Sequence, residues 1–180
     1  ESGRAPVLLR LHQPEGDDFP GPAIEPAKTA AAGAGCALAV MEPAGGSAPA
    51  NVREKYARKW ASREGRVFED IWDYPNTHRM AAVAGHTLCS MRIQDVLAAV
   101  EALREQETVD PDRIFLWGKG VLAVPALYAA VADGRVAGVL LEGPPDSHRR
   151  EDAAQTGLLQ IRVHADLPQA GGLLYPRTCV

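Results

Sequence analysis

The chain has 180 residues, 46% of them apolar, and a formal net charge of −4 at pH 7. This length fits one domain with a substantial core, and the apolar fraction argues against a disordered chain. The negative charge argues against DNA or RNA as a partner, because nucleic-acid binders normally present a basic face, and no apolar run is long enough to predict a membrane span or a membrane partner.

Apolar runs and helical patterns alternate along the chain, separated by turn-forming residues such as Pro and Gly. Strands are predicted at residues 5–12, 36–41, 113–117, 136–141 and 177–180. Helices are predicted at residues 24–32, 51–65, 91–106, 121–131 and 166–174, and a turn at 110–112. Such continuous apolar strands, alternating with helices, are typical of a parallel sheet covered on both faces. The sequence therefore predicts the fold class α/β, as a single three-layer α/β/α domain with a mostly parallel sheet.

Two of the predicted helices carry the clearest patterns. In the helix at 91–106, apolar residues recur at three- and four-residue steps, which places them on one buried stripe. This stripe consists of Ile93, Val96, Leu97, Val100 and Leu103. The helix at 51–65 interleaves Lys and Arg with Glu, which predicts a solvated amphipathic helix rather than a recognition patch.

Three cysteines, Cys36, Cys89 and Cys179, lie far apart in the sequence. They form no Cys-x-x-Cys pair and have no spaced histidine cluster near them, so we expect no metal site and no cofactor. Their odd number argues against a disulfide framework and leaves room for one bridge at most. Because Cys36 and Cys179 lie in apolar runs predicted as strands, we expect buried, inert thiols at both positions.

The stretch IFLWGKGVLAVPALYAA, at residues 114–130, predicts a buried strand that turns sharply into a helix. In many hydrolases a nucleophilic serine occupies this turn, in the pattern G-x-S-x-G. Here the five letters are GKGVL, at residues 118–122. The position that should carry the nucleophile is therefore Gly120, which has no side chain.

Several segments resemble one family. VDPDRIFLWGKG followed by ALYAAVADGRVAGVLLEGPP resembles the core of an α/β-hydrolase, and the similarity is closest to the acetyl xylan esterase and dienelactone hydrolase branch, with its prolyl-oligopeptidase-like relatives. MRIQDVLAAVEAL and HADLPQAGGLLYPR fit the same branch, and APVLLRLHQPEG resembles the strand and loop that supply half of the oxyanion hole. The resemblance covers most of the chain, but matches residues 51–79 only loosely.

Family roles transfer to this sequence with three departures. The serine position falls on Gly120, and the next motif glycine falls on Leu122. In the family, the acid comes from a loop after the strand that here is 177–180, and the histidine from a loop after one further strand. We therefore expect the domain to lack both catalytic loops, together with the family's first strands.

The resemblance nevertheless implies a binding site, because an oxyanion hole uses backbone N–H groups. The family pattern places these groups at Val121 and in the loop 12–16, and Lys119 beside the helix N-terminus would suit an anion. Ser147 follows the fourth predicted strand, at the end of the sheet where ligands of α/β proteins bind. The candidate binding residues are therefore His12, Lys119, Gly120, Val121 and Ser147.

Other groupings are weaker. His86, Cys89 and Ser90 share one side of a helix, and a Cys–His pair is a known nucleophile arrangement, although such spacing is common by chance. Ser147 and His148 are adjacent on an extended segment and therefore point apart, which argues against a dyad. Asp166 is expected to cap a helix.

The leading hypothesis is a noncatalytic α/β-hydrolase-like domain of a larger carbohydrate-esterase-like protein. One alternative is an active carboxylic-ester hydrolase, such as an acetyl xylan esterase-like deacetylase, that uses an unrecognised nucleophile or loops from another domain. Another is a module that binds a small anion or other ligand. The expected partners are a small molecule or carbohydrate, and a neighbouring domain or second copy that pairs with a sheet edge.

Overall fold

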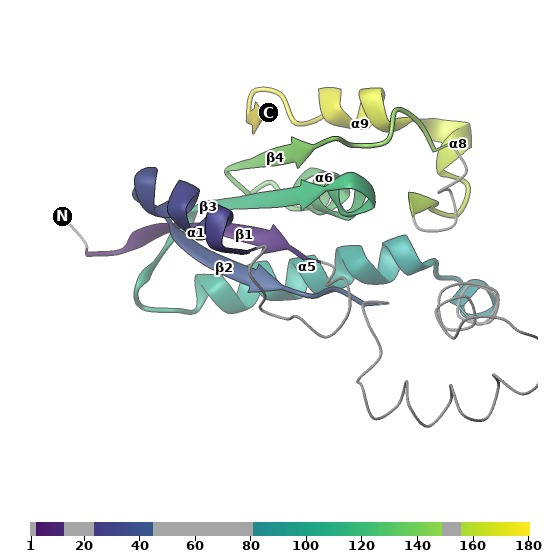
Figure 1. Ribbon diagram of the computed structural model, residues 1–180. Helices are drawn as coiled ribbons and strands as arrows, with labels where there is room; N and C mark the ends of the chain where they lie inside the picture. Colours follow the sequence, from purple (N-terminus) through teal and green to yellow (C-terminus); the bar gives the residue numbers. More distant parts are fainter. Residues whose placement is uncertain (1–2, 13–23, 45–80, 149–155) are drawn as a thin grey trace, which may run out of the picture.

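The computed structural model describes residues 3–12, 24–44, 81–148 and 156–180 (Figure 1). Five parallel strands form one sheet in the order β2-β1-β3-β4-β5. The strands are β1 (Ala5–Leu11), β2 (Ala37–Met41), β3 (Val109–Lys119), β4 (Gly138–Glu142) and β5 (Thr178–Cys179). The helices are α1 (Glu25–Gly33), α5 (Leu88–Arg104), α6 (Ala123–Ala132), α8 (Ile161–His164) and α9 (Leu167–Gly172). The predicted α/β class and parallel sheet are confirmed.

One face of the sheet carries the main core. Strand side chains alternate between faces, and in β1 the residues Val7, Leu9 and Leu11 are buried. They join Ile114 and Leu116 of β3 in one cluster, together with apolar residues of α5, α6 and α9. Right-handed crossovers place α1 on the other face of the sheet, where Figure 1 shows it beside β1 and β2. The molecule thus has helices on both faces.

Helix α5 follows the predicted stripe, but begins three residues earlier than the pattern indicated. Val96 and Val100 are fully buried, and the other stripe residues pack at the edge of the core. The earlier start comes from a capping box: Ser90 donates its N–H to Thr87 Oγ1 at 3.0 Å, and Thr87 donates its N–H to Ser90 Oγ at 2.8 Å. These bonds satisfy N–H groups that a helix start leaves free.

The predicted turn at 110–112 lies inside β3 rather than before it. Asp112 donates its N–H to Asp110 Oδ1 at 3.1 Å, which is the local bond expected of a turn. The turn forms a bulge in β3, because Ala5 pairs with Val109 but Val7 pairs with Ile114, so β3 has more residues than β1 between these two pairs. Extra residues on one strand of a pair are what defines a bulge.

Two expectations about cysteines were wrong. Cys179 is exposed, because it lies on the edge strand β5, and Cys36 is only half-buried, immediately before β2. Cys89, in α5, is the buried one, and all three are free thiols. The helix expected at 51–65 lies outside the described residues. Among the helices that the structure describes, none is both long and apolar enough to cross a bilayer.

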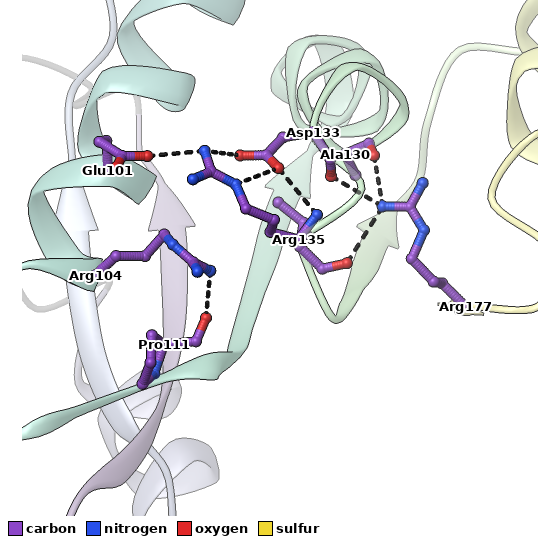
Figure 2. A network of polar contacts seen from close by, with 8 residues as sticks. Glu101, Arg104, Pro111, Ala130, Asp133, Arg135 and Arg177 are labelled. Atoms are coloured by element: carbon purple, nitrogen blue, oxygen red, sulfur yellow. Dashed lines mark hydrogen bonds and ion pairs between the residues drawn. The ribbon is translucent and has the colours of Figure 1, made fainter.

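Charged side chains bridge several elements at the amino end of the strands (Figure 2). Arg135 donates to Asp133 Oδ2 at 2.9 Å and to Glu101 Oε2 at 2.8 Å, which ties the end of α6 to α5. Arg104 Nη1 donates to the Pro111 carbonyl at 2.5 Å, where β3 begins.

Arg177 closes the end of α6. Its Nη1 donates to the carbonyls of Ala130, Asp133 and Val136 at 2.6, 3.0 and 3.2 Å (Figure 2). The last carbonyls of a helix have no partner within the helix, so a cation at this position satisfies them and matches the helix dipole.

Candidate functional site

The strand-to-helix turn after β3 lies at the carboxyl end of the central strand. Residues Gly120–Leu122 form a single 3₁₀ turn that leads directly into α6. The first motif residue, Gly118, is buried, and a Cβ there would come within 2.6 Å of Ala123 Cα and closer still to the Leu122 carbonyl oxygen. Only glycine permits this close approach of helix and strand. The turn is therefore as tight as the resemblance implies.

Gly120, at the nucleophile position, has the left-handed conformation, with φ of 56°. Residues with a side chain adopt this conformation only under strain, and the nucleophile of a G-x-S-x-G turn is held in such a strained turn. A Cβ built on Gly120 meets nothing within 4 Å. The chain thus keeps the backbone of the turn and open space at the position, but has no group to fill that space.

The residues after Gly120 serve the core. Val121 is half-buried and packs against the main cluster, and Leu122 is 3% exposed within it. The G-x-S-x-G motif has a glycine at this last position. Here the position holds Leu122, whose side chain packs in the core. The N–H of Val121 remains at the turn, where the family pattern places an oxyanion-hole donor.

Lys119 is paired with an acid. Its Nζ lies 2.5 Å from Glu142 Oε1, and the two residues are aligned in the pairing of β3 with β4. This hydrogen bond is the main cause that lowers the pKa of the Glu142 carboxyl. Arg10 lies nearby over the ring of Trp117, with 4.6 Å between the guanidinium carbon and the ring centroid. The ammonium of Lys119 is therefore balanced by a carboxylate, which weakens it as an anion ligand.

His12 follows β1 and continues its pairing with β2, because its N–H donates to the Met41 carbonyl at 2.9 Å. That N–H is consequently unavailable for an oxyanion, contrary to the prediction for the start of the loop 12–16. Burial lowers the pKa of the His12 imidazole, the Arg10 charge acts in the same direction, and Glu42 opposes both. Residues 13–16 of the loop lie outside the described residues.

A set of four residues, the α6–α9 polar cluster, joins Tyr128, Ser147, His148 and Asp166. The Ser147 hydroxyl donates to Asp166 Oδ2 at 2.5 Å, and the His148 N–H donates to Asp166 Oδ1 at 2.8 Å. The His148 ring shares a hydrogen bond of 2.8 Å, through Nε2, with the Tyr128 hydroxyl. The cluster holds a serine, a histidine and an aspartate, yet the serine bonds to the aspartate and not to the histidine. This confirms that Ser147 and His148 form no dyad.

The surroundings shift the pKa of three of these groups. Hydrogen bonds from Ser147, then from the His148 and Leu167 N–H groups, lower the pKa of Asp166 to about 2. Burial raises the pKa of Tyr128 to about 12. Burial also lowers the pKa of His148, against an opposing effect of Asp166. At neutral pH the cluster therefore contains an ionised carboxylate, a neutral phenol and a neutral imidazole.

The grouping of His86, Cys89 and Ser90 is not a nucleophile site. Cys89 is fully buried, and this burial raises the pKa of its thiol to about 12, although the Arg92 charge opposes it. A thiol must ionise to attack. Ser90 donates its hydroxyl to the Thr87 carbonyl at 2.9 Å and belongs to the helix cap.

Two pockets lie beside α9. An apolar pocket of about 250 Å³ lies between α6, the segment after β4, and α9. It is lined by Ala123, Val124, Leu127, Leu141, Pro144, Pro145, Asp146, Leu167, Pro168 and Gly171. The other, of about 220 Å³, is lined by residues 162–166 and Gln169. None of the five predicted binding residues lines either pocket, although all five lie at or after the carboxyl ends of β1, β3 or β4.

Comparison with known proteins identifies the fold. No family model matches the sequence, and no curated protein matches it. A CE15 glucuronoyl esterase from Teredinibacter turnerae superposes with a TM-score of 0.55 at 16% identity, over 98% of this chain and 48% of that one. A glucuronoyl esterase from Solibacter usitatus gives 0.55 at 17%, over 97% and 54%. A sugar hydrolase from Lactococcus lactis gives 0.50 at 12%, over 81% and 47%.

The chain thus spans about half the length of these solved structures. At these identities the similarity shows the fold alone. That fold is of the α/β-hydrolase type, and the chain shares it with carbohydrate esterases. The particular branch of acetyl xylan esterases and dienelactone hydrolases stays a prediction.

Proposed function

We propose that this chain is a noncatalytic α/β-hydrolase-like domain of a larger carbohydrate-esterase-like protein. The observation that carries the proposal is the turn at Gly120. Its left-handed backbone and the close packing at Gly118 reproduce the support of a nucleophile, while glycine offers nothing to deprotonate. Serine catalysis requires a hydroxyl with a base within hydrogen-bond reach and a third group to orient that base.

The hydroxyls of the two serines in the described ranges support the same proposal. Ser90 donates its single proton to the Thr87 carbonyl, and Ser147 donates its proton to Asp166. Neither hydroxyl therefore donates to an imidazole, as a nucleophile must. The alternative of an active esterase with an unrecognised nucleophile would require either serine to leave a bond that shapes the local structure.

The proposed ligand is a neutral carbohydrate, and the proposed region is the carboxyl end of the sheet around His12, Lys119, Gly120, Val121 and Ser147. Two features support this choice. The fold is shared with carbohydrate esterases, and Lys119 is paired with the Glu142 carboxylate, which weakens its ammonium as a ligand for an anion.

We also propose that the outer edge of β5 pairs with a neighbouring domain or a second copy. Leu173, Tyr175 and Val180 are exposed around this edge, and exposed strand edges beside apolar side chains invite pairing. Light scattering over a wide concentration range tests self-association. A monomer at all concentrations would rule out pairing with a second copy, so that a neighbouring domain would be the proposed partner.

The test of the main proposal combines p-nitrophenyl acetate hydrolysis with fluorophosphonate labelling and mass spectrometry. We expect no turnover above that of a Gly120→Ala variant, which places a methyl group where a nucleophile would begin. Stoichiometric labelling of one serine, with matching loss of turnover, would establish an active enzyme instead. Isothermal titration with neutral and acidic xylo-oligosaccharides, against a Lys119→Ala variant, tests the ligand separately.

A further inference from the structure

The α6–α9 polar cluster joins three parts of the molecule that lie far apart in the sequence. Tyr128 belongs to α6, Ser147 and His148 to the segment after β4, and Asp166 caps the N-terminus of α9. Asp166 accepts from the Ser147 hydroxyl and from two N–H groups, those of His148 and Leu167. The segment after β4 is thus fastened to α9 through Asp166, and to α6 through the ring of His148.

The fastening to α6 depends on a buried imidazole. His148 is 1% exposed, and its ring lies 5.6 Å, between centroids, from the ring of Tyr128. Its Nδ1 has no partner at hydrogen-bonding geometry within the described ranges, although the Thr156 backbone lies near enough to favour the protonated ring. A proton on this ring would place a charge, and a second N–H donor, in a site built for a neutral group.

The groups that face the ring from the described residues offer little compensation for that charge. From α6 comes the Tyr128 phenol, which is neutral at ordinary pH because burial raises its pKa to about 12. The Thr156 backbone favours the protonated ring, but burial has the larger effect on the pKa of His148. From α9 comes the Asp166 carboxylate, which favours the protonated ring. Its oxygens are already occupied by Ser147, His148 N–H and Leu167 N–H, and burial outweighs its effect on His148.

The apolar pocket adjoins this cluster. Leu127, Asp146 and Leu167 line the pocket, and each is the sequence neighbour of a cluster residue: Tyr128, Ser147 and Asp166, respectively. The pocket walls therefore belong to the same three elements that the cluster fastens together. A break in the fastening would move the walls of the pocket.

We propose that protonation of His148 detaches the segment after β4 from α6 and thereby opens the apolar pocket, so that this end of the molecule responds to mild acid. The direction follows from linkage. The pKa of His148 is lowered in the closed state from its ordinary value of 6.5, so the open state binds the proton more readily. The closed state is fully favoured above pH 6.5 and loses its advantage as the pH falls from 6.5 toward the lowered pKa.

Hydrogen exchange of the wild-type chain, measured between pH 7.5 and 4.5, tests the proposal. After correction for the intrinsic pH dependence of exchange, we expect amides in 143–148 and 166–172 to accelerate by up to about tenfold per pH unit within this window. Binding of the apolar dye anilinonaphthalene sulfonate should rise in parallel. Amides of β1 and β3 should stay protected.

Two matched variants identify the responsible group. His148→Gln keeps a side chain that can bond to Tyr128 but cannot titrate, and we expect it to abolish the acid response. His164→Gln removes an exposed histidine of α8 that lines the other pocket, and should leave the response unchanged. An acid response in His148→Gln equal to that of the wild type would overturn the proposal.

If the His148→Gln variant is already open at neutral pH, its acid response no longer tests the proposal, and the test is made on the wild-type chain. There, the imidazole carbon signals of ¹³C-labelled histidine report the protonation of each ring. A His148 midpoint that coincides with the opening of 143–148 supports the proposal, and a midpoint that differs from it by more than about one pH unit refutes it.

Discussion

The two ends of the sheet use their polar residues differently. At the amino end, Arg104 and Arg177 donate to backbone carbonyls, and Arg135 joins α6 to α5 (Figure 2). At the carboxyl end, the turn at Gly120 leaves an open space, and both pockets lie beside α9. The amino end is thus held together by charged side chains, whereas the carboxyl end carries the tight glycine turn and the open space beside it.

The largest expected effect is on stability, and it should differ between alanine variants of two glycines in the same turn. Gly118→Ala should destabilise the fold by about 3 kcal/mol, because the added methyl group would overlap the backbone of Leu122 and Ala123. Gly120→Ala should lower the free energy of unfolding by about 1 kcal/mol, because the added methyl group meets open space and only the left-handed backbone conformation is unfavourable. Urea unfolding of the two variants measures the difference. Equal losses would mean that the turn is less tightly packed than its geometry indicates.

At the amino end, Arg177→Ala should lower the free energy of unfolding by about 2 kcal/mol, because three carbonyls, one in the last turn of α6 and two between α6 and β4, lose a charged donor. The matched control is Arg135→Ala. That guanidinium is about half exposed in its pairs with Asp133 and Glu101, so we expect a much smaller loss than for Arg177→Ala. Chemical denaturation compares them, and a larger loss for Arg135 would reverse this ranking.

Across the carboxyl end, the Lys119–Glu142 pair is exposed, so Lys119→Ala should change stability by less than about 0.5 kcal/mol. Because Glu142 then loses the partner that lowers its pKa, its titration should move upward toward its ordinary value. An NMR titration of the Glu142 carboxyl carbon measures this shift. An unchanged titration would mean that another group holds the carboxylate.

The smallest expected effect is catalytic. Gly120→Ser restores a hydroxyl at the turn, but no imidazole is placed to deprotonate it in the part of the chain that the structure describes, so we expect no gain in ester hydrolysis. Turnover of p-nitrophenyl acetate and fluorophosphonate labelling are compared with those of Gly120→Ala. A weak background rate in both variants is compatible with this expectation, whereas labelling of the new serine with a clear gain in rate would show that a working base is present.

The local features of this fold could be read from residue order, and the site's contacts could not. The stripe of α5 and the cap at Asp166 follow from helical spacing and from the chemistry of a helix start, and both were predicted. The start of α5 at Leu88 was missed, because Thr87 and Ser90 signal a cap only when their bonds to each other are known. The exposure of Cys179 was mispredicted, since an apolar run does not say whether a strand lies at the edge.

The sequence by itself determined the succession of strands and helices, the α/β class, and a strand-to-helix turn with glycine at the nucleophile position. These depend on spacing and on residue type within a few positions. Only the tertiary structure decided the order β2-β1-β3-β4-β5, the pairing of Lys119 with Glu142, and the cluster in which Asp166 takes the hydroxyl of Ser147 while His148 meets Tyr128. These contacts join residues about 20 positions apart or more, and packing of whole elements against one sheet is what brings them together.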